Sequence, residues 1–156
     1  MSNADLPTVG PAEGDADIAA VRRLLLDYGR MPEFALCFDR ELAGLPGPCA
    51  PPSGALLLAI LGDDPVGTVG LCPKDAHRAE MKRLYVRPDR RGHGLGRRLA
   101  EAAIAAARSA GYRTILLETL PVMTAARDLY RSLSFAVVPA SADASPDGII
   151  RLQKSV

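Results

Sequence analysis

The stretch Arg91-Gly92-His93-Gly94-Leu95-Gly96 joins two very different patterns of side chains in this 156-residue chain. Before it, residues 80–86 read Glu-Met-Lys-Arg-Leu-Tyr-Val, which is typical of a strand. After it, residues 94–110 repeat apolar side chains at the spacing of an amphipathic helix, and Gly111 ends that helix. The sequence therefore predicts a strand, a glycine turn and a helix in direct succession.

Three alternate glycines at the start of a helix indicate a binding loop for an anion. Without Cβ atoms, Gly92, Gly94 and Gly96 let the backbone adopt unusual dihedral angles and approach a ligand. The first turn of the helix offers N–H groups without intrahelical partners and the positive end of the helix dipole. The arginines nearby are Arg87, Arg90, Arg91, Arg97 and Arg98. The loop therefore fits a pyrophosphate, and the simpler alternative is a glycine turn beside solvated arginines.

Two common pyrophosphate sites do not match this spacing. A dinucleotide fold requires Gly-x-Gly-x-x-Gly after an early strand, whereas here the third glycine comes one residue too soon and the motif lies past mid-chain. A Walker loop requires Gly-Lys-Ser or Gly-Lys-Thr, which residues 91–98 lack.

The residues around the loop give it a closer resemblance. Arg91-x-x-Gly94-x-Gly96, preceded by Val86-Arg-Pro88, resembles the acetyl-CoA motif of the GNAT superfamily of N-acetyltransferases. The resemblance extends upstream to Glu80 and downstream through Ile115–Thr119 to the segment from Ala126 to Phe135. It covers residues 80–135 in order, a combination far more specific than any single piece.

The resemblance implies how acetyl-CoA, the co-substrate, would bind without a metal. The pantetheine arm would pair with the backbone of Leu84, Tyr85 and Val86. It would enter where strands 80–86 and 114–119 splay apart. The pyrophosphate would be held by the loop and the start of the helix, namely Arg91, Gly92, His93, Gly94, Leu95, Gly96 and Arg97.

The same resemblance assigns two catalytic residues for direct attack of an amine on the thioester. An amine with a pKa of about 10.4 costs about 4.6 kcal/mol to deprotonate at pH 7, and a general base offsets much of this. Glu80 matches the position of a glutamate base, and its alternative is a structural ion pair with Lys82 or Arg83. Tyr130 matches the tyrosine that protonates the leaving thiolate, and its alternative is core packing.

One residue departs from the family pattern. Many relatives have Gly before the final Phe of this segment, where this chain has Ser134. If the position needs a left-handed dihedral angle, serine costs about 1–2 kcal/mol there.

The rest of the chain predicts a mixed α/β fold. Helices are expected from Asp15 or Asp17 to Tyr28, after Pro32 as far as Gly44, and over 124–132. The proline-rich residues 45–54 predict a loop, and further strands are expected over 55–61, 66–71, 114–119, 135–138 and 149–152. In strand 80–86, strict alternation would place Met81, Arg83 and Tyr85 on one side. The resemblance implies a mixed, mostly antiparallel sheet flanked by helices.

We expect one domain over residues 1–156, with residues 1–14 either a flexible tail or a weak first strand. Three widely spaced cysteines, Cys37, Cys49 and Cys72, argue against a disulfide framework, and we expect reduced thiols in a cytoplasmic protein. No signal peptide or membrane-spanning stretch is visible.

The partners are only partly predictable. A net charge of +1 and the lack of interleaved aromatics in segment 82–98 argue against nucleic acid. The acceptor is expected to be an amine of a small molecule or peptide that the sequence does not identify. Homodimers are common in the family, although no exposed stripe here indicates one. The alternative function is an acyl-CoA-binding sensor or interaction module without catalysis.

Overall fold

The computed structural model describes residues 6–30, 39–138 and 148–156. Its strands are β1 (Thr8–Pro11), β2 (Ala55–Leu61), β3 (Asp64–Pro73), β4 (Arg78–Val86), β5 (Thr114–Thr119), β6 (Ala136–Val137) and β7 (Ile150–Ser155). Its helices are α1 (Gly14–Gly29), α2 (Asp39–Ala43), α3 (Leu95–Ser109) and α4 (Thr124–Ser132), with short 3-10 turns η2 (Gly47–Cys49) and η3 (Pro88–Arg90).

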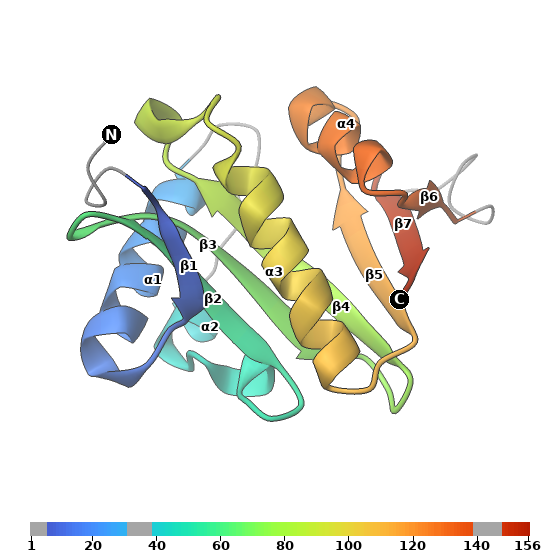
Figure 1. Cartoon of the computed structure of the whole chain (residues 1–156), viewed down its shortest axis with the longest axis horizontal. Helices are drawn as coiled ribbons and strands as arrows, with labels where there is room; N and C mark the ends of the chain where they lie inside the picture. The colour runs from blue at the N-terminus through green and yellow to red at the C-terminus, as the bar shows by residue number, and fades with distance from the viewer. Residues whose placement is uncertain (1–5, 31–38, 139–147) are drawn as a thin grey trace.

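The described strands form one sheet in the order β1-β2-β3-β4-β5-β7-β6 (Figure 1). Among these strands only β4 and β5 run parallel, so the predicted mixed, mostly antiparallel sheet is confirmed. The weak first strand is confirmed as β1, whereas residues 1–5 lie outside the described part. The helix predicted after Pro32 is described only as α2, because residues 31–38 also lie outside it.

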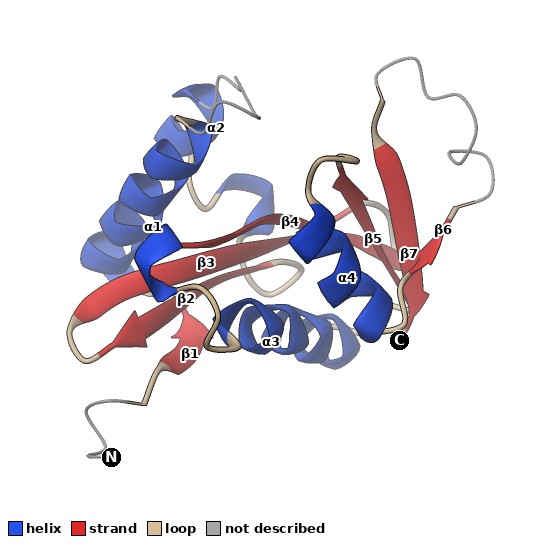
Figure 2. Ribbon diagram, turned by 90° about the horizontal axis from the view of Figure 1, so that it is seen from above, coloured by secondary structure: helices blue, strands red, loops and turns tan. Residues whose placement is uncertain are grey.

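The helices cover the sheet from two sides, with α1 and α2 on one face and α3 and α4 on the other (Figure 2). On the α3 face, Leu99 and Ala103 are fully buried in the larger hydrophobic cluster. On the α1 face, Val21 and Leu24 pack in a second cluster with Leu58 of β2. The sheet therefore separates two hydrophobic cores.

A β-bulge in β4 overturns the predicted alternation of its side chains. Thr68 pairs with Tyr85 and Gly70 pairs with Lys82, so two steps along β3 match three along β4. Arg83, inside the bulge, has a left-handed φ of 58°. The extra residue shifts the alternation of side chains by one position. Met81 is therefore buried in the cluster on the α3 face of the sheet, and Tyr85 in the cluster on the α1 face. The prediction that both lie on one side was wrong.

A disulfide joins Cys49 of η2 to Cys72 at the end of β3, so the prediction of reduced thiols was wrong for these two residues. They are 23 residues apart in sequence, but the fold brings their Cα atoms to 4.3 Å. Spacing along the chain does not reveal such proximity. Cys37 lies outside the described residues. The cytoplasmic location loses its support from reduced thiols and stays a prediction.

Within the described ranges, no helix is both long enough and apolar enough to cross a membrane.

Candidate active site

The strands β4 and β5 are paired over only part of their length. Pairing runs from Arg78 with Thr114 to Glu80 with Leu116 and then stops. Beyond Glu80, β4 stays paired with β3 on its other edge as far as Val86. Beyond Glu80, the edge of β4 that faces β5 therefore makes no strand pairing with it. This agrees with the predicted splay of the two strands.

A cavity of about 570 Å³ opens where the two strands diverge. This volume is within the range of small-molecule sites. Its walls come from α1, from the end of β4, from the glycine loop and the start of α3, and from the start of α4. They comprise Tyr28, Leu84, Tyr85, Val86, Arg91, Gly92, Gly94, Leu95, Gly96, Arg97, Val122, Met123, Thr124, Ala125, Ala126 and Leu129.

Glycine is required by the backbone at two positions of the loop. Gly92 and Gly94 have φ angles of 87° and 78°, a region that other residues rarely adopt. Gly94 caps α3, and the first backbone bond of that helix runs from Arg98 N to Gly94 O, so the amides of residues 95–97 have no partner within the helix. At Gly96 a Cβ would lie 3.5 Å from Leu129 Cδ2. The loop is therefore built to bring helix amides toward an anion between α3 and α4.

The five neighbouring arginines divide into two groups. Arg87 forms ion pairs of 2.8 Å with Asp64 and with Asp89, and these carboxylates raise its pKa further above the usual value. Arg90 also lies within ion-pair distance of both carboxylates, and Arg98 donates to the Pro7 carbonyl at 2.6 Å. These three arginines therefore support the fold around the loop.

The other two arginines line the cavity. Arg91 donates to the Val86 carbonyl at 2.9 Å and lies over the Tyr85 ring, 5.7 Å from its centroid. Arg97 bonds Ser132 of α4 and pairs with Glu101 at 3.4 Å. His93, predicted to bind pyrophosphate, is exposed and does not line the cavity.

Tyr130 lies in α4 beside the cavity wall formed by Ala126 and Leu129. Its side chain is buried, and its ring meets Phe135 edge-on with centroids 5.9 Å apart. Burial raises the pKa of Tyr130 well above its ordinary value, and the nearby Tyr28 raises it further. The phenol carries its proton at neutral pH, as an ordinary tyrosine does. The structure shows the packing role that the sequence left open for Tyr130, and the acid role stays a prediction.

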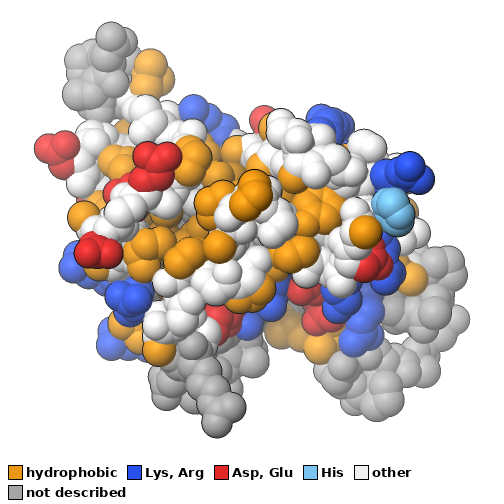
Figure 3. Space-filling view, turned by 90° about the horizontal axis from the view of Figure 1, so that it is seen from below, with side chains coloured by type: hydrophobic (Ala, Val, Ile, Leu, Met, Phe, Trp, Pro, Cys, Tyr) orange, Lys and Arg blue, Asp and Glu red, His pale blue; other side chains and the backbone are white. Residues whose placement is uncertain are grey.

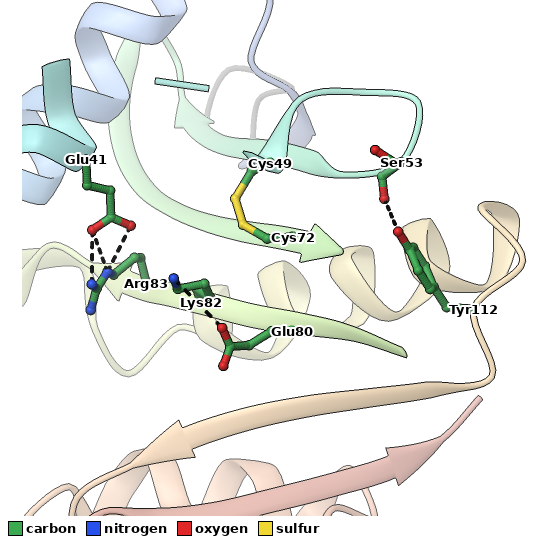
Figure 4. Close-up of a disulfide and its surroundings, with 8 residues drawn as sticks. All are labelled: Glu41, Cys49, Ser53, Cys72, Glu80, Lys82, Arg83 and Tyr112. Carbon is green, nitrogen blue, oxygen red and sulfur yellow. Dashed lines mark hydrogen bonds and ion pairs between the residues drawn. A yellow bond between two sulfur atoms is a disulfide. The ribbon is translucent and has the colours of Figure 1, made fainter. Parts of the chain in front are cut away.

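Glu80 is the last residue of β4 that pairs with β5. It belongs to a row of paired residues that crosses the sheet. The register pairs Cys72 with Glu80, Glu80 with Leu116, and Leu116 with Gln153. Residues in one register row project to the same face, so the Glu80 carboxylate lies beside the disulfide (Figure 4). Its Oε1 is 3.8 Å from Lys82 Nζ, one of the two ion pairs that the sequence left open.

Arg83, the other expected partner of Glu80, binds Glu41 of α2 instead (Figure 4). Its guanidinium makes contacts of 3.0 to 3.2 Å with both carboxylate oxygens. The ion pair lies next to Tyr28, whose pKa burial raises, while Arg83 lowers it and Glu41 raises it. Further along the sheet, Arg151 of β7 pairs with Glu118 of β5 at 3.6 Å. Each of these two acidic side chains, Glu41 and Glu118, is thus paired with an arginine.

The lower face of the molecule carries both signs of charge. In Figure 3, Lys and Arg side chains are interspersed with Asp and Glu, and hydrophobic side chains gather in the middle. That face therefore presents no continuous basic surface of the kind that binds a phosphate backbone. Within the described residues, no three His, Cys, Asp or Glu side chains lie close enough together to hold a metal ion.

The structure brings most of the predicted cofactor residues together, since all except His93 line one cavity. Neither of the predicted catalytic residues lines that cavity, although Tyr130 directly follows the wall residue Leu129 in α4. Sequence reasoning missed Tyr28 and the wall residues 122–126. Tyr28 has the helical spacing of a core residue, and nothing in its neighbours along the chain indicates a ligand.

Comparisons with known proteins agree with this geometry. The model of the acetyltransferase (GNAT) family matches residues 18–135, and the chain belongs to this family. An uncharacterized N-acetyltransferase of Schizosaccharomyces pombe is 36% identical over 106 residues, which are 62% of this chain and 61% of that protein. Two further curated relatives are matched over only 33% and 37% of their length. The chain therefore spans less than two thirds of the curated relatives it matches.

Solved structures support the fold. An acetyltransferase from Streptococcus agalactiae superposes with a TM-score of 0.81 at 19% identity, covering 96% of this chain and 98% of that one. A Salmonella typhimurium protein solved with its cofactor acetyl-CoA has a TM-score of 0.73 at 21% identity, covering 96% and 93%. The fold of this chain is that of GNAT acetyltransferases.

Proposed function

We propose that the chain, acting as one domain, transfers the acetyl group of acetyl-CoA to a primary amine of a small molecule or peptide. The observation that carries the proposal is the cavity that connects the glycine loop to the unpaired edge of β4. One end offers helix amides and two arginines for a pyrophosphate, and the other offers a strand edge for the amides of pantetheine. This pairing of sites fits the two ends of a CoA ester.

Each part of the cavity has a role in the proposed binding. Leu84, Tyr85 and Val86 would pair with the pantetheine arm, although the Val86 carbonyl already accepts from Arg91. The amides of residues 91–97 would hold the pyrophosphate. A backbone N–H near Val86 would donate to the thioester carbonyl, where negative charge develops during attack.

In the proposed reaction the amine attacks the thioester carbon directly. A C–N bond forms, the C–S bond breaks, the amine loses one proton and the CoA sulfur gains one. Glu80 would accept the amine proton directly or through a water. Tyr130 would protonate the sulfur, since its phenol carries a proton at neutral pH.

The Tyr130→Phe variant tests this assignment. Phenylalanine keeps the contact with Phe135 but removes the proton, so turnover should fall by a factor of about 10² or more. The dissociation constant of acetyl-CoA, measured by calorimetry, should change little. If turnover on an accepted amine is unchanged, Tyr130 has no acid role and serves only to pack α4.

A further inference from the structure

Given the proposed function, we infer that Tyr28 sets the length of the acyl group, because its ring lines the cavity beside Tyr85, whose other neighbour in the wall is Arg91 of the glycine loop. The ring would leave room for an acetyl group and exclude longer acyl chains. Tyr28 is thus a specificity-determining residue contributed by α1, outside the segment that binds the cofactor.

Three side chains that contact one another in turn line the cavity from the glycine loop to α1. Arg91 belongs to the glycine loop and lies 5.7 Å from the centroid of the Tyr85 ring. The Tyr85 ring in turn lies 5.3 Å from the centroid of the Tyr28 ring. All three residues line the same cavity, and Tyr85 connects Arg91 of the glycine loop to Tyr28 of α1. A CoA ester bound with its phosphates at the loop would therefore direct its acyl group toward Tyr28.

The wall at Tyr28 is rigid. Its side chain is only 8% exposed and packs in the cluster on the α1 face with Leu24 and Leu25. It meets the Tyr85 ring at an interplanar angle of 59°. Because protein interiors are close-packed, this ring cannot move aside for a larger ligand without opening the core.

Tyr28 also interacts with the proposed proton donor. It contributes to the raised pKa of Tyr130, after burial, so the two phenols are near enough to interact. Tyr130 is the proposed proton donor to the CoA sulfur, and the acyl carbon is bonded to that sulfur. An extra methylene on the acyl group would therefore meet Tyr28, and each methylene changes selection by about tenfold or more in a closed pocket.

The test compares kcat/KM for acetyl-CoA and butyryl-CoA in the whole chain and in Tyr28→Ala, with one accepted amine. The wild type should prefer acetyl-CoA by at least about tenfold, and the variant should reduce that preference by about tenfold. Calorimetric Kd values for the two CoA esters give the same comparison without an acceptor. If Tyr28→Ala does not fold, Tyr28→Leu removes most of the ring and serves instead.

Two controls separate size from other effects. Tyr28→Phe keeps the ring and should keep the acetyl preference. Tyr112→Ala removes a tyrosine that is also 8% exposed but lies outside the cavity, and should keep it too. An unchanged preference in Tyr28→Ala overturns the inference, as does an equal loss in Tyr28→Phe or a wild type that accepts both esters equally. A wild type that binds neither ester overturns the proposed function itself.

Discussion

Two observations on Glu80 favour different roles, a catalytic one and a structural one. The parallel pairing of β4 and β5 ends at this residue, where the two strands begin to diverge. Lys82 lies 3.8 Å away, close enough for an ion pair. Because both side chains keep some contact with solvent, the pair itself contributes at most about 1 kcal/mol to stability. A large effect of mutation on activity would therefore come from catalysis.

A matched pair of variants separates the two roles. Glu80→Gln removes the base and the ion pair, and should lower kcat at neutral pH by a factor of about 10² or more. Lys82→Gln removes only the ion pair, so its turnover should stay within a fewfold of the wild type. Steady-state kinetics at saturating acetyl-CoA measures both. Equal losses in the two variants would assign Glu80 a structural role.

Ser134 occupies a position that favours glycine. It follows α4 with a φ of 71°, and the Phe135 amide donates to the Tyr130 carbonyl while the Ser134 amide donates to that of Arg131. These two bonds define a Schellman motif, in which the residue at this place is usually glycine. The left-handed dihedral angle considered from the sequence is thus confirmed.

Replacing Ser134 with glycine should therefore stabilise the protein. The gain is expected to be about 1 kcal/mol, because the steric cost of a Cβ at positive φ is removed. Urea unfolding measures it. Ser132→Gly, at the last residue of α4, should have the opposite sign, because glycine weakens a helix and the bond from Arg97 to the Ser132 hydroxyl is lost. A Ser134→Gly variant that is less stable than the wild type would contradict the account of this turn.

At the scale of elements, a glycine before α3 can be compared with a glycine after it, to test whether the start of this helix binds acetyl-CoA. Gly94 and Gly111 have φ angles of 78° and 88°, and a Cβ at either would meet nothing within 4 Å. Alanine at either position should cost about 1–2 kcal/mol of stability through the same backbone strain. Only Gly94→Ala should also weaken acetyl-CoA binding, by about tenfold if the strain is carried into the loop. Equal affinities in the two variants would argue against binding by this loop.

The disulfide between η2 and β3 gives a second element-scale prediction. Unfolded without reductant, the chain should react with one equivalent of a thiol reagent, at Cys37, and after reduction with three. The Cys49→Ser variant should lose about 3 kcal/mol of stability under non-reducing conditions, since the cross-link closes a loop of 23 residues. Three reactive thiols before reduction would show that the bond does not form in solution.

Local patterns predicted the elements themselves well. The glycine turn, the amphipathic helix and the strands on either side were recognisable because their signals lie within a few residues of one another. The bulge at Arg83 was not, since it depends on how β4 pairs with β3. The disulfide was missed for the same reason, because the proximity of Cys49 and Cys72 exists only after the sheet has formed.

At the scale of the whole molecule, the donor side of the site could be predicted and the acceptor side could not. The residues predicted to bind acetyl-CoA belong to the continuous segment 84–97, whose motif specifies the backbone. The face of the sheet that carries α1 and α2 is assembled from residues far apart in sequence, such as Tyr28, Glu41 and Glu118. Glu41 is paired with Arg83, and Glu118 with Arg151. Neither local pattern nor net charge therefore reveals the acceptor.

The most direct test of the central claim is an acetyl-CoA turnover screen across polyamines, amino acids, aminoglycosides and peptide amines. Mass spectrometry would follow each acceptor while the released CoA thiol is quantified. The account predicts at least one N-acetylated product, formed in equal amount to free CoA and lost in Tyr130→Phe. Tight binding of acetyl-CoA with no acetylated product on any amine would contradict it and favour a non-catalytic acyl-CoA sensor.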